Sequence, residues 1–211
     1  MRTAREAKDV KPGLGGQEGG MKGIWEIARL GLILMIVSAV SAGALSLTYA
    51  VTKDRIATQK KLEELEAVLH TLPAARRPGE FTELTADTSA AARAYPDLSK
   101  IYIARRQGSL LGYSIQMVPR GYGGPIQMAV GIDRDGRVAG VAIIDLKETP
   151  GLGGNVAEPE WLRQFRGKMG QEKLEVGVDV DAVSGATRSS RAVSLGVREA
   201  LDAYHRFLER R

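Results

Sequence analysis

The chain has 211 residues, a formal net charge of +5, two histidines and no cysteine. The lack of cysteine excludes disulfides, thiolate catalysis, Cys-ligated iron–sulfur clusters and Cys-type zinc sites, and the dispersed charge with few aromatic residues argues against nucleic-acid binding. His70 and His205 lie far apart and outside any motif, so we expect no metal site, no catalytic residue in the chain itself, and chemistry supplied by a bound cofactor.

Residues 1–28 form a polar, glycine-rich leader, which we expect to be cytoplasmic and disordered over residues 1–22. Residues 29–52 follow as a predicted transmembrane helix, because no charged residue occurs between Arg29 and Lys53 and about 1.5 Å per residue lets this run span the hydrocarbon core. A cleaved signal peptide is the alternative, since "SAVSA" has suitable small residues. The apolar run exceeds the usual ~7–15 residues of a signal peptide and favours an uncleaved anchor.

The charges on either side of the predicted span indicate its orientation. Basic residues are more numerous before it, at Arg2, Arg5, Lys8, Lys11, Lys22 and Arg29, than close after it. The positive-inside rule therefore places the N-terminus in the cytoplasm and the larger C-terminal part outside. We expect a single-pass protein of a bacterial inner membrane with a periplasmic domain.

Residues 53–73 are predicted to form an amphipathic stalk helix, ended by Pro73. Its apolar positions recur at helical spacing among charged residues: Leu62, Leu65, Leu69 and Leu72. His70 on this helix is interpreted as a solvated side chain.

Residues 74–211 are predicted to form an α+β domain with an antiparallel-rich sheet and flanking helices. "KIYIAR" and "LLGYSIQMV" have the β-branched and aromatic residues of strands, and residues 126–146 predict a hairpin that turns at Asp133–Gly136. "EVGVDV" at 175–180 is predicted to be a further strand. A short helix is expected at the start of 158–168, and a long amphipathic helix after Thr187.

The loop "DLKETPGLGG" at 145–154 follows the second strand of the hairpin. Pro150 and Gly151 suit a type II turn, and Gly153 and Gly154 allow the backbone to approach another group closely. A tight exposed loop is the simpler interpretation, and the letters "PGLGG" also occur at 12–16 without a preceding strand.

A second loop, "DAVSGATRSS" at 181–190, leads into the last helix. The first N–H groups of that helix would attract an anion such as phosphate, and Arg188 and Arg191 add positive charge nearby. The loop is neither a Walker A loop nor a Gly-x-Ser-x-Gly elbow. A simple helix cap by Thr187 or Ser189 is the alternative.

At these residues the sequence resembles the family of FMN-binding domains. "DAVSGAT" matches the Asp-x-x-Ser/Thr-Gly-Ala-Thr signature of that family, and "GYGGPIQMAVGID", "KETPGLGG" and "WLRQFRGK" match its other motifs in order. Together with the single N-terminal span, the sequence is most similar to the G subunits of Rnf electron-transport complexes. The C subunits of the sodium-pumping NADH:quinone reductase are similar but usually longer.

The resemblance implies a set of site residues around a covalent FMN. A flavin transferase would recognise Asp181 and the Ser184-Gly185-Ala186-Thr187 run, and would esterify the FMN phosphate onto Thr187. The remaining residues that the resemblance implies as flavin contacts are Ser184, Gly185, Ala186, Arg188, Glu148, Thr149, Leu152, Gly153 and Tyr122.

The resemblance also implies a function. The chain would be a flavoprotein subunit that passes electrons, between ferredoxin and NAD, within a membrane-bound complex that couples this transfer to ion movement. Its partners would be the other membrane and peripheral subunits of that complex and a flavin transferase, and it would not catalyse turnover alone. A quinone-reductase subunit, a non-redox membrane-tethered scaffold and an independent flavoenzyme are the alternatives.

Overall fold

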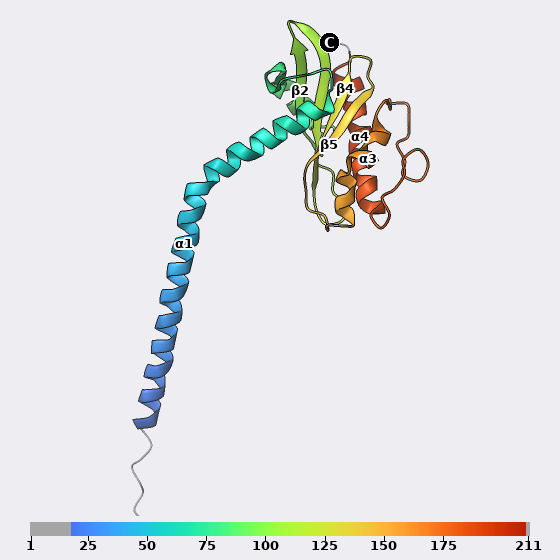
Figure 1. Cartoon of the computed structure of the whole chain (residues 1–211). Helices are drawn as coiled ribbons and strands as arrows, with labels where there is room; N and C mark the ends of the chain where they lie inside the picture. Colours follow the sequence, from blue (N-terminus) through green and yellow to red (C-terminus); the bar gives the residue numbers. More distant parts are fainter. Residues whose placement is uncertain (1–17, 210–211) are drawn as a thin grey trace, which may run out of the picture. The chain divides into compact units, whose positions relative to one another are not determined.

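The computed structural model describes residues 18–209 (Figure 1), and the chain divides into two compact units between Ala57 and Thr58. The elements follow in the order α1 (Glu18–Thr71), η1 (Pro78–Glu80), β1 (Phe81–Glu83), α2 (Thr85–Ala91), β2 (Leu98–Arg106), β3 (Ser109–Met117), β4 (Ile126–Asp133), β5 (Val138–Leu146), η2 (Gly153–Ala157), α3 (Pro159–Leu162), η3 (Arg163–Phe165) and α4 (Thr187–Phe207).

The first unit consists of the helical residues before Thr58. Within the described residues, α1 is the one helix long and apolar enough to cross a membrane, and its large apolar side chains, such as Leu34 and Leu45, are exposed. The helix begins at Glu18, inside the leader for which disorder was predicted. The rest of that predicted leader, residues 1–17, lies outside the described residues.

The second unit is built on a five-stranded antiparallel meander in the order β1-β2-β3-β4-β5. Each strand pairs with its neighbour in sequence, for example Ile101 with Ile115 and Ile115 with Val130. The predicted hairpin is confirmed: β4 and β5 are joined at Gly136, whose φ of +76° belongs to the left-handed region that favours glycine. This sheet carries the loops described below at the ends of its strands.

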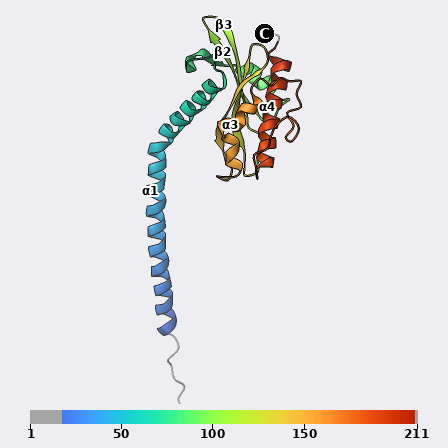
Figure 2. The same ribbon diagram turned by 45° about the vertical axis from the view of Figure 1, so that its right-hand side comes forward.

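Helices α3 and α4 cover one face of the sheet (Figures 1 and 2). Val193, Val197 and Leu201 of α4 are fully buried there, against an apolar layer that includes Ile115 and Val130. These positions follow the helical period expected from the sequence. Packing on this face is therefore almost entirely hydrophobic.

The last turns of α1 cover the opposite face, where Val68 and Leu72 are buried. The carbonyl oxygen of Thr71 lies so close to the sheet that a Cβ atom at Gly131 would lie 2.1 Å from it. Glycine is therefore required at this position for the helix end to approach the strand. The predicted helix ends before Pro73, but Leu62 from its apolar series remains half exposed.

A polar cluster also joins α1 to this face. The carboxylate of Glu64 accepts hydrogen bonds from Lys100, from the Tyr102 hydroxyl (2.9 Å) and from Gln116 Nε2 (3.0 Å). Burial alone would raise the pKa of Glu64, but these hydrogen bonds outweigh it and lower that pKa. Burial and the neighbouring Glu64 carboxylate raise the pKa of Tyr102.

One of the predicted elements differs in the structure. The segment 175–180 is not a strand: Val176 and Val180 form only an isolated bridge, inside a loop whose Leu174 N–H donates to Asp179 Oδ2 at 2.9 Å. Local hydrogen bonds to the aspartate side chain compete here with strand pairing. The short helix expected at the start of 158–168 is confirmed: it consists of α3 and η3 and ends at Phe165.

Candidate functional site

Three loops on one side of the sheet meet around a small cavity of about 240 Å³. They are the segment between β3 and β4, the segment after β5, and the segment that leads into α4. The cavity is lined by Tyr122, Thr149, Leu152, Gly153, Gly185, Ala186, Arg188 and Ser189. Seven of these eight residues are among the flavin contacts that the sequence implied, and Ser189 is the addition.

Glu148 joins the first two loops beneath the cavity. Its carboxylate accepts hydrogen bonds from the backbone N–H groups of Tyr122 (2.8 Å) and Gly123 (3.1 Å). A Cβ atom at Gly121 or Gly153 would lie 2.1 Å or 2.4 Å from this same carboxylate. Both glycines therefore make room for Glu148, and its oxygens position the Tyr122 loop rather than line the cavity.

The second and third loops meet at Gly185. This residue has a φ of +74°, and a Cβ atom built on it would lie 3.2 Å from Leu152 Cδ2. Leu152 is half exposed and Tyr122 is largely exposed, so the outer rim of the cavity is apolar and open to solvent. The glycines that the sequence singled out therefore serve turn geometry and close contact between loops.

The start of α4 leaves the Thr187 hydroxyl available. The helix begins at Thr187, its N-cap residue is Ala186, and no side chain caps it. The structure thus does not use Thr187 or Ser189 as the helix cap that was the alternative interpretation. Ser190 closes the preceding turn instead, because its Oγ accepts from Val183 N–H (3.0 Å) and donates to the Ala186 carbonyl oxygen (3.0 Å). Thr187 itself is exposed.

The surroundings of Thr187 suit a phosphate group. The first N–H groups of a helix have no partner within the helix and carry its positive dipole end. Among the described residues, the Ser189 Oγ is fully buried and has no hydrogen-bond partner, although the residue lines the cavity. Arg188 places its guanidinium 5.8 Å from the centroid of the Tyr122 ring, at the cavity edge. Donors and positive charge therefore converge where the phosphate of a nucleotide would bond.

Two residues of α3 and η3 hold the loop before Thr187. The carbonyl oxygen of Asp181 accepts a hydrogen bond from Trp161 Nε1 at 2.7 Å, and its N–H donates to Gln164 Oε1 at 2.7 Å. Sequence reasoning had noted the segment that contains Trp161 and Gln164 but gave neither residue a role. The sequence did contain a signal for this role: the polar Gln164 stands next to the apolar Leu162 and Phe165 in that segment.

Two predicted recognition residues lie outside the cavity. The side chains of Asp181 and Ser184 are exposed and do not line it, so they face solvent beside Thr187. No cluster of His, Asp or Glu that could hold a metal ion occurs within residues 18–209.

Comparison with known families agrees with this geometry. A family model described as FMN-binding domain matches residues 121–202, and one described as RnfG N-terminal region matches residues 21–70. The first match contains all three loops of the cavity. The fold and the site thus define a protein with an FMN-binding domain.

Relatives identify the family more closely. The chain is 34% identical to the G subunit of the Na⁺-translocating ferredoxin:NAD⁺ oxidoreductase complex of Acetobacterium woodii, over 85% of this chain and 93% of that one. It is 30% identical to the G subunit of the ion-translocating oxidoreductase complex of Vibrio cholerae, over 83% and 89% of the two chains. The chain therefore belongs to the family of G subunits of ion-translocating oxidoreductase complexes.

A solved structure has the same fold. The crystal structure of Shewanella oneidensis NqrC superposes with a TM-score of 0.54 at 19% identity, and covers 72% of this chain and 98% of that one. At this identity the similarity concerns the architecture of the domain.

Proposed function

We propose that the chain is the flavoprotein subunit of a membrane-bound, ion-translocating electron-transport complex, and that it carries FMN as a phosphoester on Thr187. Membership of the G-subunit family and the FMN-binding domain match support the first part. The second part depends on one observation: an exposed, uncapped hydroxyl on the first turn of α4, next to a buried and unpartnered Ser189 Oγ.

The attachment step is a transfer rather than a direct condensation. The Thr187 hydroxyl loses its proton and its oxygen forms the new bond to phosphorus, while a pyrophosphate bond of a flavin dinucleotide donor breaks and a nucleoside monophosphate leaves. No atom changes its oxidation state. A flavin transferase would bring the donor, and the exposed Asp181 and Ser184 beside Thr187 are the side chains that it could recognise.

The residues around Thr187 would hold the phosphate end. Ser189 Oγ and the first N–H groups of α4 would donate to the phosphate, and Arg188 would offset its charge. Thr149, Leu152 and Tyr122 would form the walls beside the ring. Since the cavity of about 240 Å³ is below the ~300 Å³ usual for complete ligand pockets, much of the ring would remain open to a partner subunit.

FMN, when bound, supplies the redox chemistry, and the chain orients it. The anchor helix would keep this centre at the membrane, with the N-terminus cytoplasmic by the charge asymmetry of the flanks and the FMN domain outside. Electrons would pass through this subunit between other subunits of the complex. A covalent bond would prevent loss of the cofactor on the outer side of the membrane, where free flavin is dilute.

The test is flavin fluorescence of the denatured chain on a gel, after co-expression with a flavin transferase. Wild type should give a fluorescent band, Thr187→Ala should give none, and an intact-mass measurement should show the corresponding added mass only in wild type. Thr82→Ala is the matched control, because Thr82 is also exposed but lies on β1. It should keep the full signal.

A fluorescent Thr187→Ala band would reject Thr187 as the attachment residue. An unmodified wild-type chain from its native membrane would reject the covalent attachment, and a complex that purifies without flavin colour would reject the flavoprotein role and favour a membrane-tethered scaffold.

A further inference from the structure

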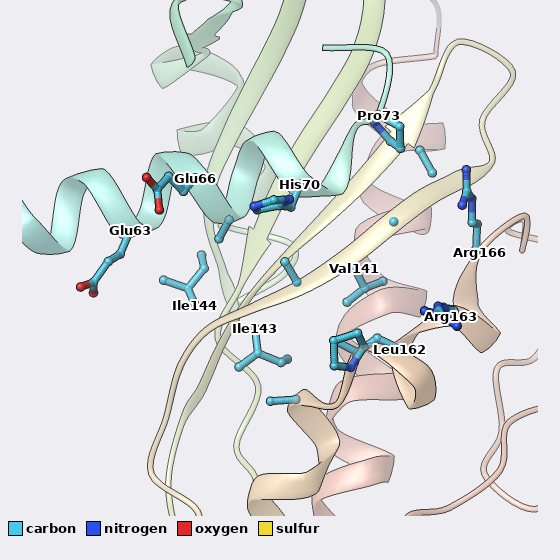
Figure 3. A pocket seen from close by; sticks show the side chains of 16 residues that line it. Glu63, Glu66, His70, Pro73, Val141, Ile143, Ile144, Leu162, Arg163 and Arg166 are labelled. Carbon is cyan, nitrogen blue, oxygen red and sulfur yellow. The ribbon is translucent and has the colours of Figure 1, made fainter. Parts of the chain in front are cut away.

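The free edge of β5 opens into a groove of the second unit with a volume of about 670 Å³ (Figure 3). In the sheet order, β5 is an end strand and no other strand pairs with its outer edge among the described residues. At the start of that edge, Val138 already exchanges backbone hydrogen bonds with the turn after η3, donating to the Lys168 carbonyl oxygen (2.9 Å) and accepting from Gly167 N–H (2.8 Å). The edge can therefore pair, and beyond Val138 it faces the groove.

The two edges of the sheet are protected differently. β1, at the opposite end, has three residues and ends in the charged Glu83. β5 has nine residues and carries no charged side chain before Asp145. Short strands and charged residues are the usual means of keeping other chains from adding to an exposed edge. β5 lacks both, although it is the longer and more apolar edge.

Two helical segments border the groove on either side of β5. The last turns of α1 contribute Glu63, Glu66 and His70 to one wall, and α3 with η3 contributes Leu162, Arg163 and Arg166 to the other (Figure 3). The floor between them consists of small and apolar residues of β5: Ala139, Gly140, Val141, Ala142, Ile143 and Ile144. One wall is thus acidic; on the other, Arg163 is already paired with Glu160 (2.7 Å), and Arg166 supplies the positive charge above the apolar strand edge.

We propose that an extended segment of another subunit of the complex adds to β5 as a sixth strand. Backbone hydrogen bonds to the free edge would provide affinity, and side chains on alternate faces would provide specificity. The segment would carry small or apolar residues at its centre. Basic side chains would face Glu63 and Glu66, and an acidic side chain would face Arg166. This docking site is separate from the Thr187 site and does not require flavin.

The chain has no cysteine, so an introduced cysteine is the only thiol of this subunit, and a photo-crosslink from it is assigned in the intact complex by this chain's labelled peptide. Glu66→Cys and Arg166→Cys place the probe on the two walls, and Thr82→Cys on β1 is the matched control at the other edge. The probe is a maleimide–benzophenone, and products are identified by peptide mass spectrometry in the purified complex. Both groove positions should crosslink to one short segment of another subunit, and Thr82→Cys should not.

Charge reversal tests the proposed complementarity. A probe at Glu63→Cys should lose most of its crosslinking when Glu66→Lys and Arg166→Glu are introduced together, since both walls then repel the segment. The gel fluorescence of this variant should remain at the wild-type level, because neither residue lies near Thr187. Unchanged crosslinking in the reversed background would contradict the proposal.

Amide hydrogen exchange distinguishes strand addition from side-chain contact. Amides in residues 140–144 that exchange quickly in the isolated full-length chain should exchange about tenfold more slowly in the complex, whereas those of β1 should not change. Crosslinking without slower exchange would overturn strand addition. Crosslinks only to a second copy of this chain or to lipid, or no crosslinks from the groove, would overturn the proposal that another subunit binds here.

Discussion

The two faces of the sheet are covered by helices that pack in different ways. α4 covers one face with fully buried Val193, Val197 and Leu201, whereas α1 reaches the other through the Glu64 cluster and the close contact of Thr71 with Gly131. Hydrophobic packing tolerates small adjustments of a helix, but hydrogen bonds and backbone contact fix its position. The face that supports Thr187 is thus held by burial, and the face that carries the end of α1 is held by the buried Val68 and Leu72 together with the polar groups around Glu64.

The largest expected effect on stability comes from removing a core side chain on the α4 face. Leu201→Ala removes a fully buried side chain and should lower the free energy of unfolding by about 2–5 kcal/mol. Chemical denaturation of the full-length chain in detergent, followed by circular dichroism, measures this change. Leu62→Ala is the matched control on a half-exposed leucine and should change stability by less than ~1 kcal/mol. Equal losses would contradict the assigned core.

Gly131→Ala tests the contact between α1 and the sheet. The added Cβ would lie 2.1 Å from the Thr71 carbonyl oxygen, so the helix end must move away, at a cost of about 1–3 kcal/mol. Thermal unfolding should show the loss. Gly79→Ala is the control, because a Cβ at Gly79 has no atom within 4 Å. Wild-type stability of Gly131→Ala would mean that α1 does not pack here.

Glu64→Gln tests the polar cluster and its pH dependence. The amide leaves Lys100 without its carboxylate, so we expect a loss of about 1 kcal/mol at neutral pH, while Glu63→Gln on the exposed side should have little effect. Because the pKa of Glu64 is lowered from its ordinary value of 4.5 in the folded chain, the stabilisation is present above that value and is lost as the pH falls through the lowered pKa. The difference in the free energy of unfolding between wild type and Glu64→Gln should therefore shrink below about pH 4.5. A difference that grows in acid would show that the Glu64 carboxylate is not the source of the stabilisation.

Ser189→Ala should have the smallest effect on the flavin-free chain. Its buried Oγ has no partner among the described residues, so removal should be neutral or stabilising by less than ~1 kcal/mol. Ser190→Ala, the neighbouring control, removes the two hydrogen bonds that close the turn before α4 and should lower stability by about 1 kcal/mol or more. The reverse order of the two losses would mean that Ser189 Oγ serves the fold rather than a ligand.

The sequence predicted the α4 face better than the α1 face. The 3.6-residue spacing of Val193, Val197 and Leu201 and the hairpin at Gly136 are local patterns, and both are present. The docking of α1 depends on Gly131 of β4 and on Ser114 and Gln116 of β3; Gln116 donates to Glu64, and Ser114 Oγ lies 3.2 Å from Thr71 Oγ1. Strand pairing alone brings these residues opposite the helix, and no pattern along the chain reveals it.

The site was predictable to the extent that its residues lie in short motifs. Tyr122, Leu152, Gly185 and Arg188 were named from such motifs, and the structure brings them to one cavity. The role of Glu148 beneath the Tyr122 loop could not be foreseen, because the hydrogen bonds run between segments 25 residues or more apart. The segment 175–180 was mispredicted because its alternating valines are typical of a strand, while the Asp179 carboxylate accepts a hydrogen bond from the Leu174 N–H.

The exposed position of Thr187, on a helix whose buried side is already complete, bears on when the protein matures. Its hydroxyl can be reached without unfolding the domain, so the proposed flavin loading would not have to coincide with synthesis or membrane insertion. On the same proposal, a cell short of riboflavin would accumulate folded, colourless subunits and convert them later, once the vitamin returns.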